Sequence, residues 1–103
     1  GQSFNFGPYD QKNYSVKKLL NEFTKQMPDL KWQIRKSKKK FHEASLLNLN
    51  SKKTFKLINW KNKINFKESA LLTSNWYKMY FKIRHMKQFT KSQIQDYKRN
   101  LNK

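Results

Sequence analysis

The side chains in this sequence that could do chemistry are mostly ammonium and guanidinium groups. The chain has 24 Lys and Arg against six Asp and Glu in 103 residues, a net charge of +18. Charge of one sign at this density repels itself, so a compact fold needs a negative partner. Nucleic-acid phosphate and anionic membrane are the two abundant choices. Because 21 of the cations are Lys, which acts as a point charge, we expect contacts with a phosphate backbone more than reading of bases.

Four groups of basic residues are the candidate RNA contacts. The first three are Arg35, Lys36, Lys38, Lys39 and Lys40, then Lys52 and Lys53, then Lys61 and Lys63. The fourth, interleaved with aromatic residues near the C-terminus, is Arg84, Lys87, Lys91, Lys98 and Arg99. Aromatic and basic side chains together suit unpaired RNA bases and their backbone. The alternative for the first group is a charged loop in solvent, and for the fourth an amphipathic helix packed on a protein.

No set of residues is typical of catalysis or metal binding. His42 and His85 are the only histidines, and the chain has no Cys and only two Gly. A metal site needs three or four convergent ligands, and a phosphate-binding loop of the common kind needs several glycines. We therefore expect a protein that is not an enzyme, with no cofactor, metal or small-molecule substrate. No apolar run approaches the ~20 residues of a transmembrane helix.

Helical spacing of apolar residues marks three segments. The apolar residues within residues 16–27 form one stripe at helical spacing, which predicts a helix. Pro28 ends it, because the residue before a proline is pushed out of the helical region. A second helix is predicted over residues 66–81 and a third over residues 92–100. The third has a capping box at residues 90–93, where Thr is followed three positions later by Gln.

Alternation of apolar and polar residues predicts strands over residues 3–6 and 31–35. Two further strands are predicted over residues 41–49 and 54–60, on either side of turn residues. The last two, joined by a turn rich in Asn and Ser, predict an antiparallel hairpin. The order therefore predicts an α/β fold, a small sandwich with a mixed β-sheet and β-α-β-β-α order. This domain covers residues 1–80, and a basic, partly helical tail covers residues 81–103.

Several segments, taken in order, carry a resemblance to a known family. They are Phe4-Asn5-Phe6, Ser15 to Leu19 with Phe23, Met27-Pro28-Asp29-Leu30, the basic loop 36–40, the strands 43–49 and 53–60, and residues 66–68. Together they resemble the thioredoxin-like family that certain mitochondrial ribosomal proteins share with a small accessory subunit of respiratory complex I. The match covers about residues 3–80 and lacks the redox cysteines of thioredoxin.

The resemblance implies a non-enzymatic assembly component. Its ribosomal branch packs on ribosomal RNA and neighbouring ribosomal proteins, and the net charge of +18 favours that branch on electrostatic grounds alone. The sequence thus predicts a structural protein of the mitochondrial ribosome, in the matrix, that is not a free homo-oligomer. The alternatives are a non-catalytic accessory subunit of a respiratory complex, and a peripheral membrane protein whose basic tail binds anionic lipid.

Overall fold

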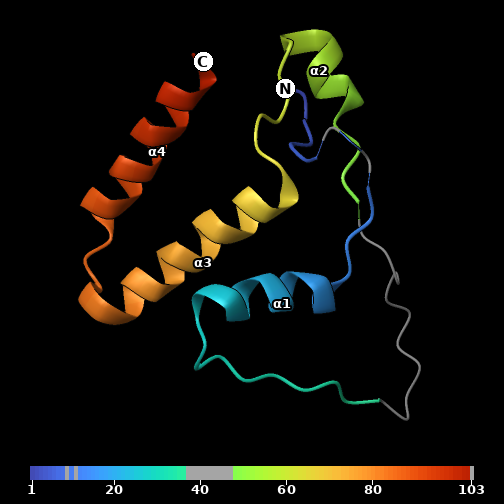
Figure 1. Ribbon diagram of the computed structural model, residues 1–103. Coiled ribbons are helices and arrows are strands. Elements are labelled where there is room, and N and C mark those ends of the chain that lie inside the picture. The colour runs from blue at the N-terminus through green and yellow to red at the C-terminus, as the bar shows by residue number, and fades with distance from the viewer. Residues whose placement is uncertain (9, 11, 37–47, 103) are drawn as a thin grey trace.

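The computed structural model describes residues 1–8, 10, 12–36 and 48–102, and this part of the chain is helical without a strand. The helices are α1 (Val16–Gln26), α2 (Lys52–Ile58), α3 (Phe66–Ile83) and α4 (Lys87–Leu101). Figure 1 shows α3 at the centre, α1 below it, and α4 running back from its far end, while α2 lies beside the N-terminus. The predicted α/β sandwich with its mixed sheet is therefore wrong.

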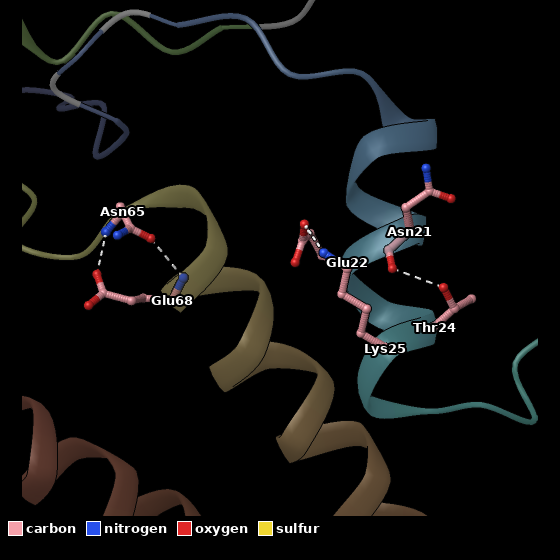
Figure 2. Close-up of polar contacts among 6 residues, drawn as sticks. All are labelled: Asn21, Glu22, Thr24, Lys25, Asn65 and Glu68. Carbon is pink, nitrogen blue, oxygen red and sulfur yellow. Dashed lines mark hydrogen bonds and ion pairs between the residues drawn. The ribbon is translucent and has the colours of Figure 1, made fainter.

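α1 forms where the sequence predicted a helix. The Ser15 hydroxyl oxygen accepts a hydrogen bond from the backbone N–H of Lys18 at 3.1 Å, which satisfies a donor that the helix start leaves unpaired. Glu22 Oε1 and Lys25 Nζ pair on its surface at 2.9 Å (Figure 2). The helix ends just before Pro28, as the restriction on the preceding residue requires.

α3 begins at a reciprocal cap formed by Asn65 and Glu68. Asn65 Oδ1 accepts from the backbone N–H of Glu68 at 2.9 Å, and Glu68 Oε2 accepts from the backbone N–H of Asn65 at 2.7 Å (Figure 2). This capping box satisfies two donors and places a carboxylate at the positive end of the helix dipole. At its other end α3 closes on Arg84, whose φ of 57° lies in the left-handed region. The predicted helix over residues 66–81 is confirmed.

α1 packs on one side of α3. Lys67 on α3 attracts the carboxylate of Glu22 on α1. Ala70 and Ser74 follow Lys67 at spacings of three and four residues, which places them on that same side of the helix. Both are buried, with 1% and 0% of their surface exposed. Their small side chains let the two helices approach closely, because interaxial distance follows side-chain size at the contact.

α4 packs on the opposite side of α3, through side chains that the sequence predicted as its own cap. The Trp76 indole N–H donates to Thr90 Oγ1 at 2.9 Å, and Gln93 Nε2 donates to the Leu72 carbonyl oxygen at 3.0 Å. α4 begins at Lys87, before the predicted start, and no side chain caps it. The predicted capping box is therefore wrong, because its hydroxyl and amide bind the neighbouring helix.

The N-terminal segment, predicted as a strand over residues 3–6, is irregular, and it binds the start of a helix and not a strand. Alternate carbonyl oxygens over residues 3–7 accept hydrogen bonds from the side chains of Lys53, Thr54 and Ser51. These three hydrogen bonds hold one edge of the segment against the start of α2. Side chains of α2 thus take the place of the predicted neighbouring strand.

The other predicted strands are absent from the described residues. Most of residues 54–60 is helix α2, where Asn59 ends the helix at φ 53°, a left-handed conformation that Asn tolerates. Four apolar residues in a run of seven are too few for periodicity to separate a strand from a helix. Residues 31–35 are irregular, as are residues 48 and 49. The rest of the predicted strand over residues 41–49 lies outside the described residues.

The helices leave an open fold with a thin core. The Cα radius of gyration is 16.5 Å, whereas a compact domain of this length has about 13 Å. The accessible surface is 9512 Å², whereas a compact monomer of this mass exposes about 6,200 Å². Ala70 is the one buried apolar residue in the described part of the chain. Most apolar side chains therefore keep surface that a partner can cover.

Candidate nucleic-acid interface

The first predicted group of RNA contacts is only partly described. Arg35 and Lys36 are exposed in the irregular segment that follows α1. Lys38, Lys39 and Lys40 lie outside the described residues. The structure therefore places two cations of this group at the surface.

Lys52 and Lys53 lie in the first turn of α2 and not at the tip of a hairpin, which corrects the predicted position. Lys53 Nζ donates to the Ser3 carbonyl oxygen at 2.9 Å and lies 4.9 Å from the centre of the Phe4 ring. Its ammonium group therefore holds the N-terminal segment against α2. Lys52 is exposed and stays a candidate phosphate contact.

Lys61 and Lys63 lie in the loop between α2 and α3, where they line an open cavity of about 340 Å³. Tyr14 and Phe66 line the same cavity, with ring centres 4.0 Å apart and ring planes 4° apart. Lys18 Nζ lies 4.8 Å from the Tyr14 ring centre, which is a cation–π contact. This loop thus places two exposed ammonium groups next to a pair of stacked rings.

α4 carries the most regular basic surface. Lys87, Lys91 and Lys98 are exposed and lie at spacings of four and seven residues. These spacings place them on one side of the helix, about 6 and 10.5 Å apart along its axis. We call these three residues the lysine stripe. Asp96, the one acidic residue of α4, lies on another side and pairs with Arg99 at 3.3 Å.

Most acidic side chains in the described chain are engaged close by in the sequence. Glu22 and Asp96 pair with basic residues three positions away. Glu68 caps α3, and Asp10 Oδ1 accepts a backbone N–H two residues further on. From residue 69 to residue 95 the sequence has no Asp or Glu. Nearly all of α3 and the first half of α4 therefore lack an acidic group of their own.

An exposed aromatic surface at the end of α3 was not predicted. α1 has 11 residues and α3 has 18, so α1 leaves the C-terminal part of its side of α3 uncovered. Tyr77 and Phe81 continue the line of Ala70 and Ser74 along this side, and they are 46% and 64% exposed. Tyr80, one position before Phe81, is exposed as well. The unequal lengths of the two predicted helices were the signal that could have located this surface.

Arg84 joins this aromatic surface to α4. Its guanidinium carbon lies 5.9 Å from the centre of the Tyr80 ring, within cation–π range. Arg84 itself is exposed, and Lys87 at the start of the lysine stripe follows three residues later. The structure thus brings the fourth predicted group together with aromatic side chains at Arg84, as it does the second group at Lys53. Within the described residues, no three His, Asp or Glu side chains gather as metal ligands would. No described helix is long and apolar enough to span a bilayer.

No family description, curated protein or solved structure matches this chain. The resemblance to the thioredoxin-like family therefore stays a prediction, and the fold that it implied is contradicted by the four helices.

Proposed function

We propose that this chain is a structural RNA-binding protein, a non-catalytic component of a ribonucleoprotein particle, and that the particle is the ribosome. One observation carries the proposal. A net charge of +18 is spread over an open helical fold whose longest acid-free stretch, residues 69–95, contains Lys87 and Lys91, the first two residues of the lysine stripe. No acidic side chain within residues 69–95 offsets the positive charge of that stretch.

The internal ion pairs do little to relieve the repulsion. The pairs formed by Lys25 with Glu22 and by Arg99 with Asp96 are local, and each has at least one strongly exposed side chain. Exposed pairs of this kind contribute little to stability, because solvent and salt screen them and both side chains lose freedom. A nucleic acid does more, because each lysine that meets a phosphate releases a condensed counterion into the solvent.

The thin core supports a role inside an assembly. Apolar side chains on three helices keep large exposed fractions, among them Leu57 on α2, Phe81 on α3 and Ile94 on α4. A small protein gains stability by burying such groups, at roughly 25 cal/mol per Å² of apolar surface. Neighbouring proteins and RNA can supply the missing cover, as the expected ribosomal partners would. The mitochondrial location came only from the resemblance, so it stays a sequence-based expectation and the proposal does not depend on it.

The test is sedimentation of the tagged full-length chain from its source cells. We expect it to co-sediment with ribosomal particles at low salt and to leave them at high salt or after ribonuclease treatment. Migration with a detergent-solubilised membrane complex, indifferent to nuclease, would favour the respiratory alternative and contradict the proposal. Free migration at low salt would contradict it as well.

A further inference from the structure

The exposed aromatic residues at the end of α3 form an ordered cluster. We define the aromatic shelf as Trp76, Tyr77, Tyr80 and Phe81. The Trp76 and Tyr80 rings are nearly parallel, with planes 7° apart and centres 5.7 Å apart. Phe81 meets Tyr80 at 65° with a 5.7 Å separation, and Tyr77 meets Trp76 edge-on at 5.4 Å. The shelf therefore presents aromatic faces in several orientations over about two turns of one helix.

Neighbouring helices limit the movement of this cluster. The Trp76 indole N–H is bound to Thr90 of α4, which fixes the innermost ring. Tyr80 lies between Trp76, Phe81 and the guanidinium group of Arg84. The outer rings are accessible, because Tyr77, Tyr80 and Phe81 are 46%, 36% and 64% exposed. Because these rings are already held in place, the protein loses little side-chain entropy when a ligand stacks on them.

The charged side chains next to the shelf along α3 and at the start of α4 are all positive, since residues 69–95 contain no Asp or Glu. Lys78 and Lys82 are exposed on the adjoining side of α3, and Arg84 lies over Tyr80 at the end of the helix. The lysine stripe of α4 begins three residues beyond Arg84. A ligand that matches this surface combines flat apolar faces with closely spaced negative charge.

We propose that the aromatic shelf stacks on unpaired RNA bases, while the lysine stripe contacts the phosphate backbone that leads to them. This inference rests on the proposed function and names its ligand, which is a single-stranded segment adjoining an RNA helix. Bases within a duplex show only their edges, whereas unpaired bases expose faces that stack on aromatic and guanidinium groups. Stacking of this kind tolerates any base, so binding depends on RNA shape more than on sequence.

An anionic membrane is the other ligand that combines apolar and negative surface, and the geometry fits it less well. A helix that lies on a membrane has an apolar face along its length. The side of α3 that carries Tyr77 and Phe81 is exposed only near its C-terminal end. Toward the N-terminus the same side is buried against α1 at Ala70 and Ser74. The exposed apolar part is short and aromatic, which suits one or two bases.

The test measures binding of the full chain to three RNAs with equal numbers of phosphates. They are a duplex, a single strand, and a duplex with a single-stranded tail that carries the fluorescent base 2-aminopurine. The variants are Phe81→Ala and Tyr77→Ala, with Phe81→Trp as the variant that keeps a ring. The matched control is Leu57→Ala, which removes an apolar side chain of similar exposure, 60%, from α2.

We expect the wild-type chain to prefer the tailed RNA and to quench 2-aminopurine as the base stacks. Each alanine variant should lose roughly tenfold in affinity for the tailed RNA, within the range measured for single stacked bases. Affinity for the duplex should be unchanged, and Phe81→Trp and Leu57→Ala should behave as wild type. Quenching by the wild-type chain tests the contact even where a variant folds poorly.

Other outcomes overturn the inference in distinguishable ways. Equal binding of duplex and tailed RNA by all forms, without quenching, removes the shelf from RNA binding and leaves the proposed function standing. Failure of the wild-type chain to bind any of the RNAs removes both. Binding to vesicles of phosphatidylcholine and phosphatidylserine that Phe81→Ala weakens, while RNA binding stays unchanged, assigns the shelf to lipid.

Discussion

Replacing the lysine stripe with glutamine should reduce the salt dependence of RNA binding by an amount that counts the lost phosphate contacts. Lys87, Lys91 and Lys98 lie on one exposed side of α4. Gln has nearly the helix propensity of Lys, so the triple variant should keep α4 helical. Each phosphate contact adds about 0.9 to the slope of log K against log salt for a duplex and about 0.7 for a single strand. Three lost contacts therefore lower the slope by about 2 to 3.

This slope change is large enough to measure by fluorescence anisotropy with a labelled RNA. Between ~50 and ~200 mM KCl, the affinity of the wild-type chain should fall about 20- to 40-fold more than that of the variant. The control is a second triple variant with the same loss of charge, Lys17→Gln, Lys56→Gln and Lys67→Gln, which takes one lysine from each other helix. It should weaken binding through net charge while keeping most of the slope.

The reasoning is refuted by either of two results. If the slope of the α4 variant equals that of the wild-type chain, the stripe touches no phosphate. If both triple variants lower the slope equally, the RNA responds to total charge and the regular spacing on α4 has no special role. Circular dichroism of both variants shows whether helix content is matched before the slopes are compared.

Three further predictions concern the helices that carry these surfaces. Ala70→Leu should lower the free energy of unfolding in urea by about 1–3 kcal/mol, because it adds bulk where α1 meets α3. Thr90→Val should cost about 0.5–1.5 kcal/mol and speed hydrogen exchange in α4, since it removes the acceptor of the Trp76 indole N–H. The hydrogen bond from Lys25 lowers the pKa of Glu22 below its ordinary 4.5. The ionised Glu22 side chain therefore stabilises the folded chain fully above pH 4.5, and this contribution disappears as the pH falls through the lowered pKa. Glu22→Gln should therefore lose less helix content on acidification, by circular dichroism, than the wild-type chain.

Each of these has an outcome that contradicts it. For Ala70→Leu, the control is Thr73→Leu, which changes an exposed position of α3. If the Thr73 and Ala70 variants are equally stable, α1 does not press on Ala70. Unchanged exchange in α4 after Thr90→Val would mean that the indole bond does not hold the helix. An acid-induced loss of helix in Glu22→Gln as large as in the wild-type chain would assign that loss to other carboxyl groups.

The helices α1 and α3 could be predicted because long apolar stripes end at clear signals. Ser15 and Pro28 bound α1, and its stripe runs over three turns, long enough for only the helical period to fit. The capping box of Asn65 and Glu68 marks the start of α3 in the same way, although it was not used in placing that helix. The bounds of these helices depend on neighbouring residues in the sequence, such as caps and a proline. A single sequence is therefore enough to locate them.

The predicted sheet failed because alternation of apolar and polar residues does not tell what a segment pairs with. Residues 3–6 form no strand, and the carbonyl oxygens of Ser3 and Asn5 accept hydrogen bonds from side chains of α2. Residues 54–60 contain β-branched and aromatic residues that suit a strand, yet the run is short and tertiary contacts decide its state. Thr54, wholly buried with its hydroxyl on Asn5, is one such contact. Contacts between residues some fifty positions apart, as in this pair, cannot be read from local pattern.

The candidate site could be predicted in charge but not in geometry. Composition alone predicted a polyanionic partner, and the predicted cations are all exposed where described. Lys53 is exposed but already engaged, because its ammonium group donates to the Ser3 carbonyl oxygen. The lysine stripe needs α4 to begin at Lys87, which depends on the contacts of Thr90 and Gln93 with α3. A helix starting at residue 92 would have left Lys87 and Lys91 in a loop with no common face.

Thin packing and high charge have the same consequence for this chain. A core with one buried apolar residue in its described part gives little energy to set against the repulsion of 18 net charges. A ligand that binds only the folded form adds stability by mass action, about 2.7 kcal/mol at a hundred times its dissociation constant. That gain is a large share of the stability of a small domain. An RNA that lies along α4 and the end of α3 would neutralise the acid-free stretch and cover the exposed rings together. Such a partner would therefore supply the stability that a larger core provides in other proteins of this size.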